Sequence, residues 1–337
     1  MATALSELGH EVHVITEGLR SREGRRNENG ATVHELPIIC STNRYSEYFR
    51  NLDGPLTYSQ GVYEFLVRLG REERFDIIDF PLRGAEGFVS LQYHPGPIVV
   101  SLHTASVQLA ELEGRQPNLQ ERALAGLESE CLAQAAGILS HSYSTLEEIE
   151  RLYGFRRDAK PTRIVPHGLP PLPGMNRRKI PGQERSSVEA LVIGRLELRK
   201  GTRLLFDVLP GVLRQEARLR VRFVGVDDST NEGFDELTGT TYPEYFRQRF
   251  PDLADRVLFE KYGSDECLRA CYAEADFLLL PSLHESNGQI LLEAMRSALP
   301  TITFENGVTR EIFARDEFQS TELIFYKSIV YLGRPAL

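Results

Sequence analysis

The sequence has little that would place the protein in a membrane, on nucleic acid or outside the cell. None of its apolar runs is long enough to span a bilayer, and its N-terminus lacks the basic and apolar regions of a signal peptide. Its 48 acidic residues outnumber 39 basic ones, giving a net charge of −9, whereas nucleic-acid-binding proteins usually carry a basic excess. An anionic small ligand is still compatible, because it needs only a few local cations. We therefore expect a cytoplasmic protein.

Cysteine is scarce, and its spacing provides neither a disulfide framework nor a zinc site. The four residues are Cys40, Cys131, Cys267 and Cys271, and no four ligands converge in the sequence. Three lie in apolar contexts, which predicts buried thiols in a reducing compartment. No predicted strand is followed by G-x-G-x-x-G, which argues against a nicotinamide-dependent oxidoreductase.

Short apolar runs alternate with helical patterns along a chain of 337 residues, which is long enough for two domains. The runs are continuously apolar, as buried parallel strands are, so the alternation predicts doubly wound α/β sheets. In the first half, strands are predicted at residues 12–16, 32–39, 76–80, 97–103 and 137–141, and helices at 58–71, 119–134 and 144–153. In the second half, strands are predicted at 188–194, 219–226, 257–261, 276–281 and 300–304, and helices at 201–216, 265–275 and 288–297.

Residues 166–187 interrupt this alternation. They are rich in proline, glycine and polar residues and leave little to bury, which predicts a linker between an N-terminal domain of residues 1–165 and a C-terminal domain of residues 188–337. Ligands of doubly wound sheets bind at the carboxyl ends of strands, so the loops after strands are the candidate site.

The loop GRLELRKG, residues 194–201, lies between a predicted strand and a predicted helix and carries two cations. Backbone N–H groups at a helix N-terminus favour anions, and Arg195 and Lys200 add charge aimed at the same space. Arginine can grip a phosphate bidentately, and lysine acts as a mobile point charge. The alternative is a pair of solvated basic residues, and this segment alone supports both interpretations equally.

The segment PSLHESNGQILLEAM, residues 281–295, carries two glutamates. Glu285 lies in the loop, and Glu293 lies in the following helix at the border of its apolar stripe. A half-buried carboxylate needs donors, which a polyhydroxylated ligand could supply; alternatively, Glu293 is a surface residue favoured by the helix dipole. Eight residues at a helical rise span about 12 Å, beyond the roughly 5–9.5 Å of glycosidase carboxylate pairs, which favours ligand holding over hydrolysis.

Two further loops follow predicted strands. His103 ends the run PIVVSLH and is expected to point out of the carboxyl edge of the sheet, although a histidine that caps the next turn is an equally simple interpretation. Gly307 and Glu311, in NGVTRE, are interpreted as a turn and a helix start, with Glu311 in the first helical turn.

Together these segments resemble the retaining glycosyltransferases of family 4. LGHEVHVIT, SLHTAS, RIVPHGL, GRLELRKG and PSLHESNGQILLEAM occur in the order and spacing of that family, and the likeness extends to about Glu311. The E-x7-E pair beside GR-x4-KG is the most specific part. The resemblance implies an α/β, GT-B fold, in which two facing Rossmann-like, doubly wound domains have a cleft between them.

The resemblance also implies roles for loop residues. Arg195 and Lys200 would hold the diphosphate of a nucleotide sugar, and Glu285 would contact hydroxyls of the transferred sugar. The remaining positions implied for donor binding or the reacting centre are Asn287, Gly288 and Gln289 beside the sugar and phosphates, Glu293 at the ribose, and His103 as a catalytic residue with Glu285. Cations preplaced at the diphosphate would stabilise the charge that develops as the glycosidic bond breaks. No DxD-type cluster supports a metal, and no cofactor is expected beyond the donor itself.

The sequence departs from the family pattern at both ends. The family begins with a strand and a glycine-rich loop before the helix that corresponds to MATALSELG, and it continues after Glu311 with a further strand and helices. Here the tail differs, although residues 322–332 could form an edge strand. We expect a chain truncated at both ends, with weak or no activity, since loss of a central strand exposes the edges of its neighbours.

The expected function is transfer of a sugar from a nucleotide diphosphate sugar to an unknown carbohydrate, lipid or small-molecule acceptor, with retention of configuration. The main alternative is a non-catalytic nucleotide-sugar-binding remnant or scaffold. Nucleic acid is not expected as a partner. Peripheral contact with an anionic membrane is left open by the basic run at residues 20–26, although its interleaved glutamates favour a solvated loop.

Overall fold

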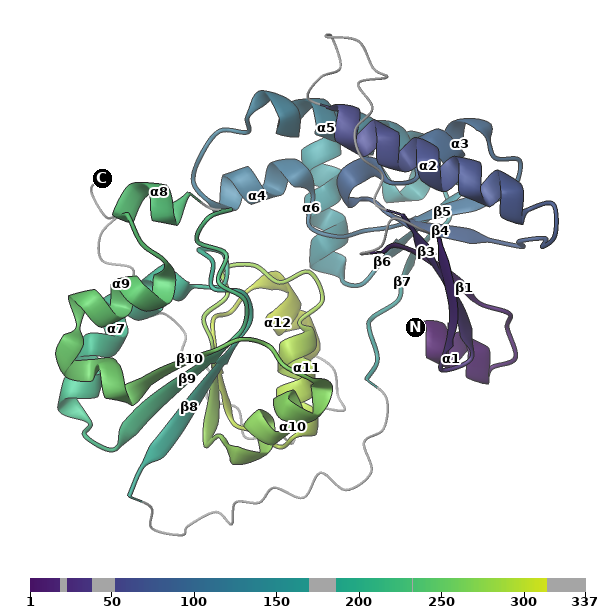
Figure 1. Cartoon of the computed structure of the whole chain (residues 1–337). Helices are drawn as coiled ribbons and strands as arrows, with labels where there is room; N and C mark the ends of the chain where they lie inside the picture. The colour runs from purple at the N-terminus through teal and green to yellow at the C-terminus, as the bar shows by residue number, and fades with distance from the viewer. Residues whose placement is uncertain (19–22, 38–51, 170–185, 232, 314–337) are drawn as a thin grey trace. The chain divides into compact units, whose positions relative to one another are not determined.

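The computed structural model describes residues 1–18, 23–37, 52–169, 186–231 and 233–313 of the chain (Figure 1). The chain divides into two compact units, Met1–Gly168 and Leu169–Leu337. Most of the predicted linker lies outside the described residues, as do Cys40 and the predicted edge strand at 322–332. No helix within the described ranges is both long and apolar enough to cross a membrane.

The first unit contains two sheets. One has the order β4-β5-β6-β7 with every pair parallel; in the other, of order β1-β3-β2, β1 is parallel and β2 antiparallel to β3. Within the described ranges β1 and β4 each pair with a single strand. The strands are β1 (His13–Glu17), β2 (Gly24–Glu28), β3 (Ala31–Leu36), β4 (Ile78–Pro81), β5 (Ile98–Ser101), β6 (Gly137–Ser140) and β7 (Thr162–Ile164). The helices are α1 (Ala2–Glu7), α2 (Asp53–Leu69), α3 (Phe88–Tyr93), α4 (Ser106–Leu112), α5 (Leu119–Gln134) and α6 (Tyr143–Tyr153).

Helix α6 shows how local sequence positions the carboxyl edge of the four-stranded sheet. Ser142 caps its start by accepting a hydrogen bond from the Thr145 N–H at 3.1 Å, and Gly154 ends it in the left-handed conformation at φ 63°. Leu146 and Ile149 are buried in the core with residues of β5 and β6. The cap therefore fixes where the loop after β6 turns into the helix.

The second unit is built on one parallel sheet of order β10-β9-β8-β11-β12. Its strands are β8 (Val188–Ile193), β9 (Leu219–Val224), β10 (Val257–Glu260), β11 (Phe277–Leu280) and β12 (Thr301–Thr303). Its helices are α7 (Thr202–Gln215), α8 (Phe234–Thr238), α9 (Tyr242–Arg249), α10 (Asp265–Glu274), α11 (Gln289–Arg296) and α12 (Gly307–Phe313). In chain order, β9 and β10 are added to one side of β8, whereas β11 and β12 are added to its other side. The direction in which strands are added therefore reverses between β8 and β11.

The central strand β8 explains the continuous apolar runs of this unit. Its side chains alternate between two cores: Ala190 and Val192 pack in the cluster with α7 and α9, and Leu191 and Ile193 pack in the cluster with α10 and α11. Helices cover both faces of the sheet, so both sets of side chains are buried. The prediction of a doubly wound second sheet is confirmed.

A hairpin was missed in the first unit. The basic run at residues 20–26 was interpreted as a loop, but β2 begins at Gly24 and pairs with β3. The two residues that connect them, Asn29 and Gly30, have positive φ angles of 50° and 87°. Asn-Gly between two strands is the strongest short-range hairpin signal, but the polar sequence of β2 concealed it.

Three other expectations were wrong in detail. Strand β5 ends at Ser101, so His103 lies beyond the strand rather than at its last residue. Cys267 lies on helix α10 as predicted, but it is exposed, whereas Cys131 and Cys271 are buried. Glu311 lies past the first turn of α12, which begins at Gly307.

Candidate functional site

Two loops meet at the carboxyl ends of β8 and β11, where the strand order of the second sheet reverses. Residues 194–201 follow β8 and residues 281–288 follow β11, and the Leu283 N–H donates to the Arg199 carbonyl at 2.9 Å. Gly201 permits this approach: its φ is 79°, and a Cβ there would lie 2.3 Å from the Pro281 carbonyl oxygen. Ligands of open α/β sheets bind at such a reversal, so both loops predicted to hold ligand lie where the fold favours binding.

An ion pair between Lys200 and Glu285 joins the two loops. The distance from Lys200 Nζ to Glu285 Oε1 is 2.7 Å, and the two side chains are 14% and 9% exposed. An ammonium has three N–H donors and this pair uses one, so Lys200 can donate to a further anion without releasing Glu285. The structure thus brings together two residues that are 85 positions apart in the chain.

Arg195 lies in the same loop, but its guanidinium contacts other carboxylates. Its Nη1 donates to Asp228 Oδ2 at 2.8 Å, and its Nη2 lies 3.1 Å from Glu197 Oε2. Asp228 follows β9, so the arginine ties the loop after β8 to the loop after β9. The Arg195 side chain is 44% exposed and its guanidinium has five N–H donors, so it can still offer N–H groups to a ligand.

The start of α11 presents backbone N–H groups beside Glu285. Gly288 precedes the helix in the left-handed conformation at φ 65°, and Asn287 accepts a hydrogen bond from the Gln289 N–H at 3.0 Å. Glu293, further along α11, accepts from the Tyr272 hydroxyl at 2.7 Å and from Gln289 Nε2 at 3.2 Å. Burial and the nearby Glu293 carboxylate raise the pKa of Tyr272. Glu293 therefore links α11 to α10 within the protein, and its contact with a ribose stays a prediction.

Three histidines gather at the carboxyl edge of the four-stranded sheet in the first unit. His103 follows β5, His141 follows β6 and His167 follows β7. The ring centroid of His141 lies 5.3 Å from that of His103 and 3.8 Å from that of His167. His141 is 4% exposed, and its Nδ1 lies 3.1 Å from the Val165 carbonyl oxygen. Because a carbonyl only accepts, Nδ1 donates, and in the neutral ring Nε2 retains a lone pair.

The surroundings of His103 and His167 favour their uncharged rings. Burial lowers the pKa of His103, and His141 and Arg83 lower it further. Burial also lowers the pKa of His167, to about 4, with additional contributions from His141, His103 and the N-terminal ammonium. A neutral His103 can hydrogen-bond a sugar hydroxyl through either ring nitrogen. The structure tests neither its catalytic role nor the alternative of a turn cap, so both stay predictions.

This cluster should make the first unit sensitive to acid. The pKa of His167 is about 4 in the folded protein against an ordinary 6.5, so between these values the unfolded chain binds more protons and stability falls as pH falls. Thermal unfolding at pH 7.5 and pH 5.0 should show a lower midpoint at pH 5.0, and His167→Gln should reduce that difference. An unchanged difference in the variant, with His10→Gln at an exposed histidine as the control, would contradict this assignment.

A buried carboxylate joins two loops at the carboxyl edge of the four-stranded sheet. Glu128 on α5 is fully buried and accepts hydrogen bonds from Gly84 N–H at 3.1 Å, Ser106 Oγ at 2.6 Å and the hydroxyl of Tyr153. Gly84 follows β4 and Ser106 begins α4, just after His103 and Thr104. Glu128 therefore anchors the loop between β5 and α4, which carries His103.

Replacing Glu128 with glutamine should destabilise the first unit. The amide nitrogen cannot accept, so buried donors are left unpaired, at a cost of about 1–3 kcal/mol for each such group. We expect a lower urea midpoint by circular dichroism for Glu128→Gln. Glu130→Gln, at an exposed position on the same helix, is the matched control, and equal midpoints for the two variants would count against the network.

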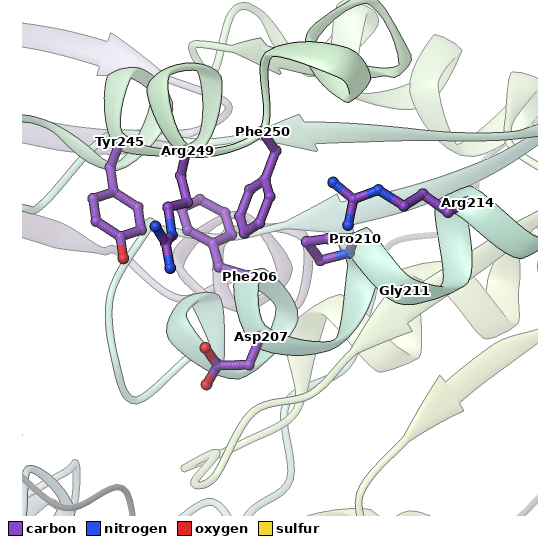
Figure 2. A pocket seen from close by; sticks show the side chains of 8 residues that line it. All are labelled: Phe206, Asp207, Pro210, Gly211, Arg214, Tyr245, Arg249 and Phe250. Carbon is purple, nitrogen blue, oxygen red and sulfur yellow. The ribbon is translucent and has the colours of Figure 1, made fainter.

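A cavity of about 340 Å³ lies elsewhere in the second unit, between α7 and α9 (Figure 2). It is lined by Phe206, Asp207, Pro210, Gly211, Arg214, Tyr245, Arg249 and Phe250. No predicted site residue belongs to this lining, and Arg214 at its rim pairs with Asp252 at 3.0 Å. The cavity is therefore separate from the loops after β8 and β11.

Two Rossmann-like units on one chain, the second with a basic loop beside a glutamate loop at its strand-order reversal, define an α/β protein of the GT-B fold. The chain belongs to Glycosyltransferase Family 4, whose model matches residues 1–171, and the model for Glycosyl transferases group 1 matches residues 188–326. It is a glycosyltransferase of carbohydrate biosynthesis.

Individual relatives agree with this family. Over 329 residues the chain is 26% identical to D-inositol 3-phosphate glycosyltransferase of Kineococcus radiotolerans, covering 92% of this chain and 72% of that protein. Sucrose-phosphate synthase from Thermosynechococcus elongatus has a similar structure, with a TM-score of 0.69, 18% identity, and 91% and 74% of the two chains covered. Anabaena HepE in complex with UDP-glucose gives a TM-score of 0.57 at 16% identity, covering 84% of this chain and 70% of that one.

Several residues at these strand ends were not found from the sequence. Asp228 and Glu197 hold Arg195, and His141 and His167 surround His103. Asp228 follows a predicted strand, His141 ends one, and Glu197 lies in the basic loop. His167 falls in the predicted linker, and its only signal was the segment RIVPHGL that resembles the family. Among the described residues, no cluster with metal-ligand spacing includes a residue of the loops after β8 or β11.

Proposed function

We propose that this glycosyltransferase moves a hexosyl group from a nucleotide diphosphate sugar to an acceptor hydroxyl, with retention of anomeric configuration. The observation that carries the proposal is the Lys200–Glu285 pair at the strand-order reversal of the second sheet. Lys200 would bind the diphosphate and Glu285 would bind sugar hydroxyls, and the two side chains are hydrogen-bonded to each other. Relatives in complex with UDP-glucose or with ADP support a nucleotide-linked donor.

The chemistry follows from where charge develops. The bond between the anomeric carbon and the diphosphate oxygen breaks, so negative charge grows on the leaving diphosphate. Lys200, the partly exposed Arg195 and the N–H groups of Asn287 and Gly288 stabilise that charge more in the transition state than in the ground state. The acceptor hydroxyl attacks from the same face of the sugar as the leaving group, and its proton passes to the diphosphate.

The remaining residues orient the sugar. Glu285 accepts hydrogen bonds from sugar hydroxyls while it holds Lys200, and Glu293 accepts from the ribose in addition to Tyr272. We also assign a catalytic role to His103 as a neutral imidazole, because burial lowers its pKa. We assign no metal and no cofactor to this chemistry.

A thermal-shift screen over UDP, GDP, ADP and their sugars tests the proposal. One base should raise the unfolding temperature, and the corresponding sugar nucleotide should then be consumed, with transfer to an acceptor or slow hydrolysis. A product of the same anomeric configuration as the donor, seen by NMR, supports retention. Binding without turnover would instead favour the non-catalytic nucleotide-sugar-binding protein, and no shift with any nucleotide would contradict both.

A further inference from the structure

Three potential metal ligands converge where β1 begins, away from the loops discussed above. His13 is the first residue of β1, Glu11 lies two positions earlier, and Glu73 follows α2. Residues two apart in an extended chain share a face, so Glu11 and His13 point the same way. One ligand atom of each of the three residues lies within 4.8 Å of the other two.

The imidazole of His13 is held rigidly. Its side chain is 5% exposed, its ring stacks on His34 at 5.2 Å, and it meets the edge of Phe75 at 5.4 Å. Its Nδ1 lies 3.0 Å from His34 Nε2, and its Nε2 lies 3.4 Å from Glu11 Oε1. His34 is 5% exposed and lies on the neighbouring strand β3. With the shared proton on His13 Nδ1, the lone pair of Nε2 faces the carboxylates.

The two carboxylates lack other strong partners. Glu11 contacts only His13 in an ion pair, and among the described residues the carboxylate of Glu73 has no hydrogen-bond or ion-pair partner. Two like charges beside a buried imidazole repel each other unless a cation lies between them. A histidine oriented by a buried second group is also the usual arrangement of a ligating histidine.

We propose that Glu11, His13 and Glu73 bind one divalent transition-metal ion of the Zn²⁺ type, with His34 orienting His13. Bonds of about 2.0–2.2 Å from one ion to imidazole nitrogen and carboxylate oxygens are reachable from ligand atoms this close, after small side-chain rotations. The nitrogen ligand selects against Mg²⁺ and Ca²⁺, which prefer oxygen only. Three protein ligands leave a fourth position for water.

The site has a structural role and is independent of the proposed transfer reaction. It joins the start of β1 to the connection between α2 and β4. These residues lie at the amino ends of β1 and β4, whereas His103 and the other histidines follow the carboxyl ends of strands. Metal binding should therefore stabilise the first unit without being required by the loops of the second.

Titration of chelator-treated full-length protein with Zn²⁺ and Co²⁺ tests the proposal. Calorimetry should show one Zn²⁺ per chain and no heat with Mg²⁺. Glu73→Gln should weaken binding by more than the roughly 10- to 100-fold that follows loss of a second-shell partner, and His34→Asn should weaken it within that range. Glu72→Gln, an exposed neighbour of Glu73, should bind as the unchanged protein does.

The Co²⁺ absorption spectrum identifies the ligands. Nitrogen and oxygen ligands alone give only weak visible bands, whereas a thiolate charge-transfer band would assign the metal to a cysteine and overturn the proposal. Equal affinity of the Glu73→Gln and Glu72→Gln proteins, or no Zn²⁺ binding, would also overturn it. Glu73 is only partly buried, so its variant should keep the circular dichroism of the unchanged protein, and His13→Gln then serves as a second test in which Zn²⁺ binding is lost.

Discussion

Lys200→Met is expected to lower kcat by about 10²–10³-fold, the effect of removing one preorganised group that stabilises a developing negative charge. The substitution keeps most of the volume of the side chain and removes the ammonium that the structure places 2.7 Å from Glu285. The loss should appear mainly in kcat, because the charge on the diphosphate grows as the bond breaks. Initial rates over a range of donor concentrations measure it.

Two companion variants separate this effect from a structural one. Lys200→Met leaves Glu285 enclosed without its partner, so the protein should also lose stability, whereas the double variant Lys200→Met/Glu285→Gln removes both charges and should recover it. Activity should not recover in the double variant. Lys261→Met, at an exposed lysine directly after β10 of the same sheet, is the matched control. A single variant with normal kcat would remove Lys200 from the mechanism.

Glu285→Gln is expected to lower kcat/KM by about 10- to 100-fold. The reason is the loss of charge-assisted hydrogen bonds to sugar hydroxyls, each worth about 1.5–3 kcal/mol. The amide also holds Lys200 less firmly, so donor binding weakens together with the chemical step. Steady-state kinetics with the donor found in the thermal-shift screen provide the measurement.

The control for Glu285 is another glutamate at the same edge of the sheet. Glu305 follows β12 and pairs with Arg310 at 2.9 Å, but its side chain is 38% exposed. Glu305→Gln should leave kcat/KM unchanged. If the two glutamine variants lose activity equally, the effect is not specific to the loop after β11, and the assignment of Glu285 to the sugar fails.

All five strands described in the second unit were predicted from the sequence, but helices α8 and α9 were not. Its strands are mainly apolar because the sheet is covered on both faces, although β9 carries Arg220 and Arg222, and helix α10 lies within one residue of its predicted bounds. The two candidate loops were found because they follow those strands. The family resemblance implied only that Lys200 and Glu285 serve the same ligand, and the ion pair between them was not predicted, since the order of strands in a sheet is a long-range property.

The first unit was harder to predict because its signals are weaker. Strand β2 is polar and exposed, β7 has only three residues, and helices such as α3 and α4 are short. The sequence did not indicate that His141 and His167 lie beside His103, because this depends on β5, β6 and β7 being neighbours in the sheet. Asp228 likewise pairs with Arg195 because β8 and β9 are neighbours, and no local sequence pattern predicts that pairing of strands.

Hydrogen–deuterium exchange with and without the nucleotide diphosphate is the most direct measurement of where the donor binds. The amides of residues 194–201 and of residues 282–289 should both exchange more slowly in the presence of nucleotide, and the protection should disappear in the Lys200→Met protein. Protection confined to the cavity between α7 and α9, or protection of the two loops that survives the loss of Lys200, would contradict donor binding at the β8–β11 reversal.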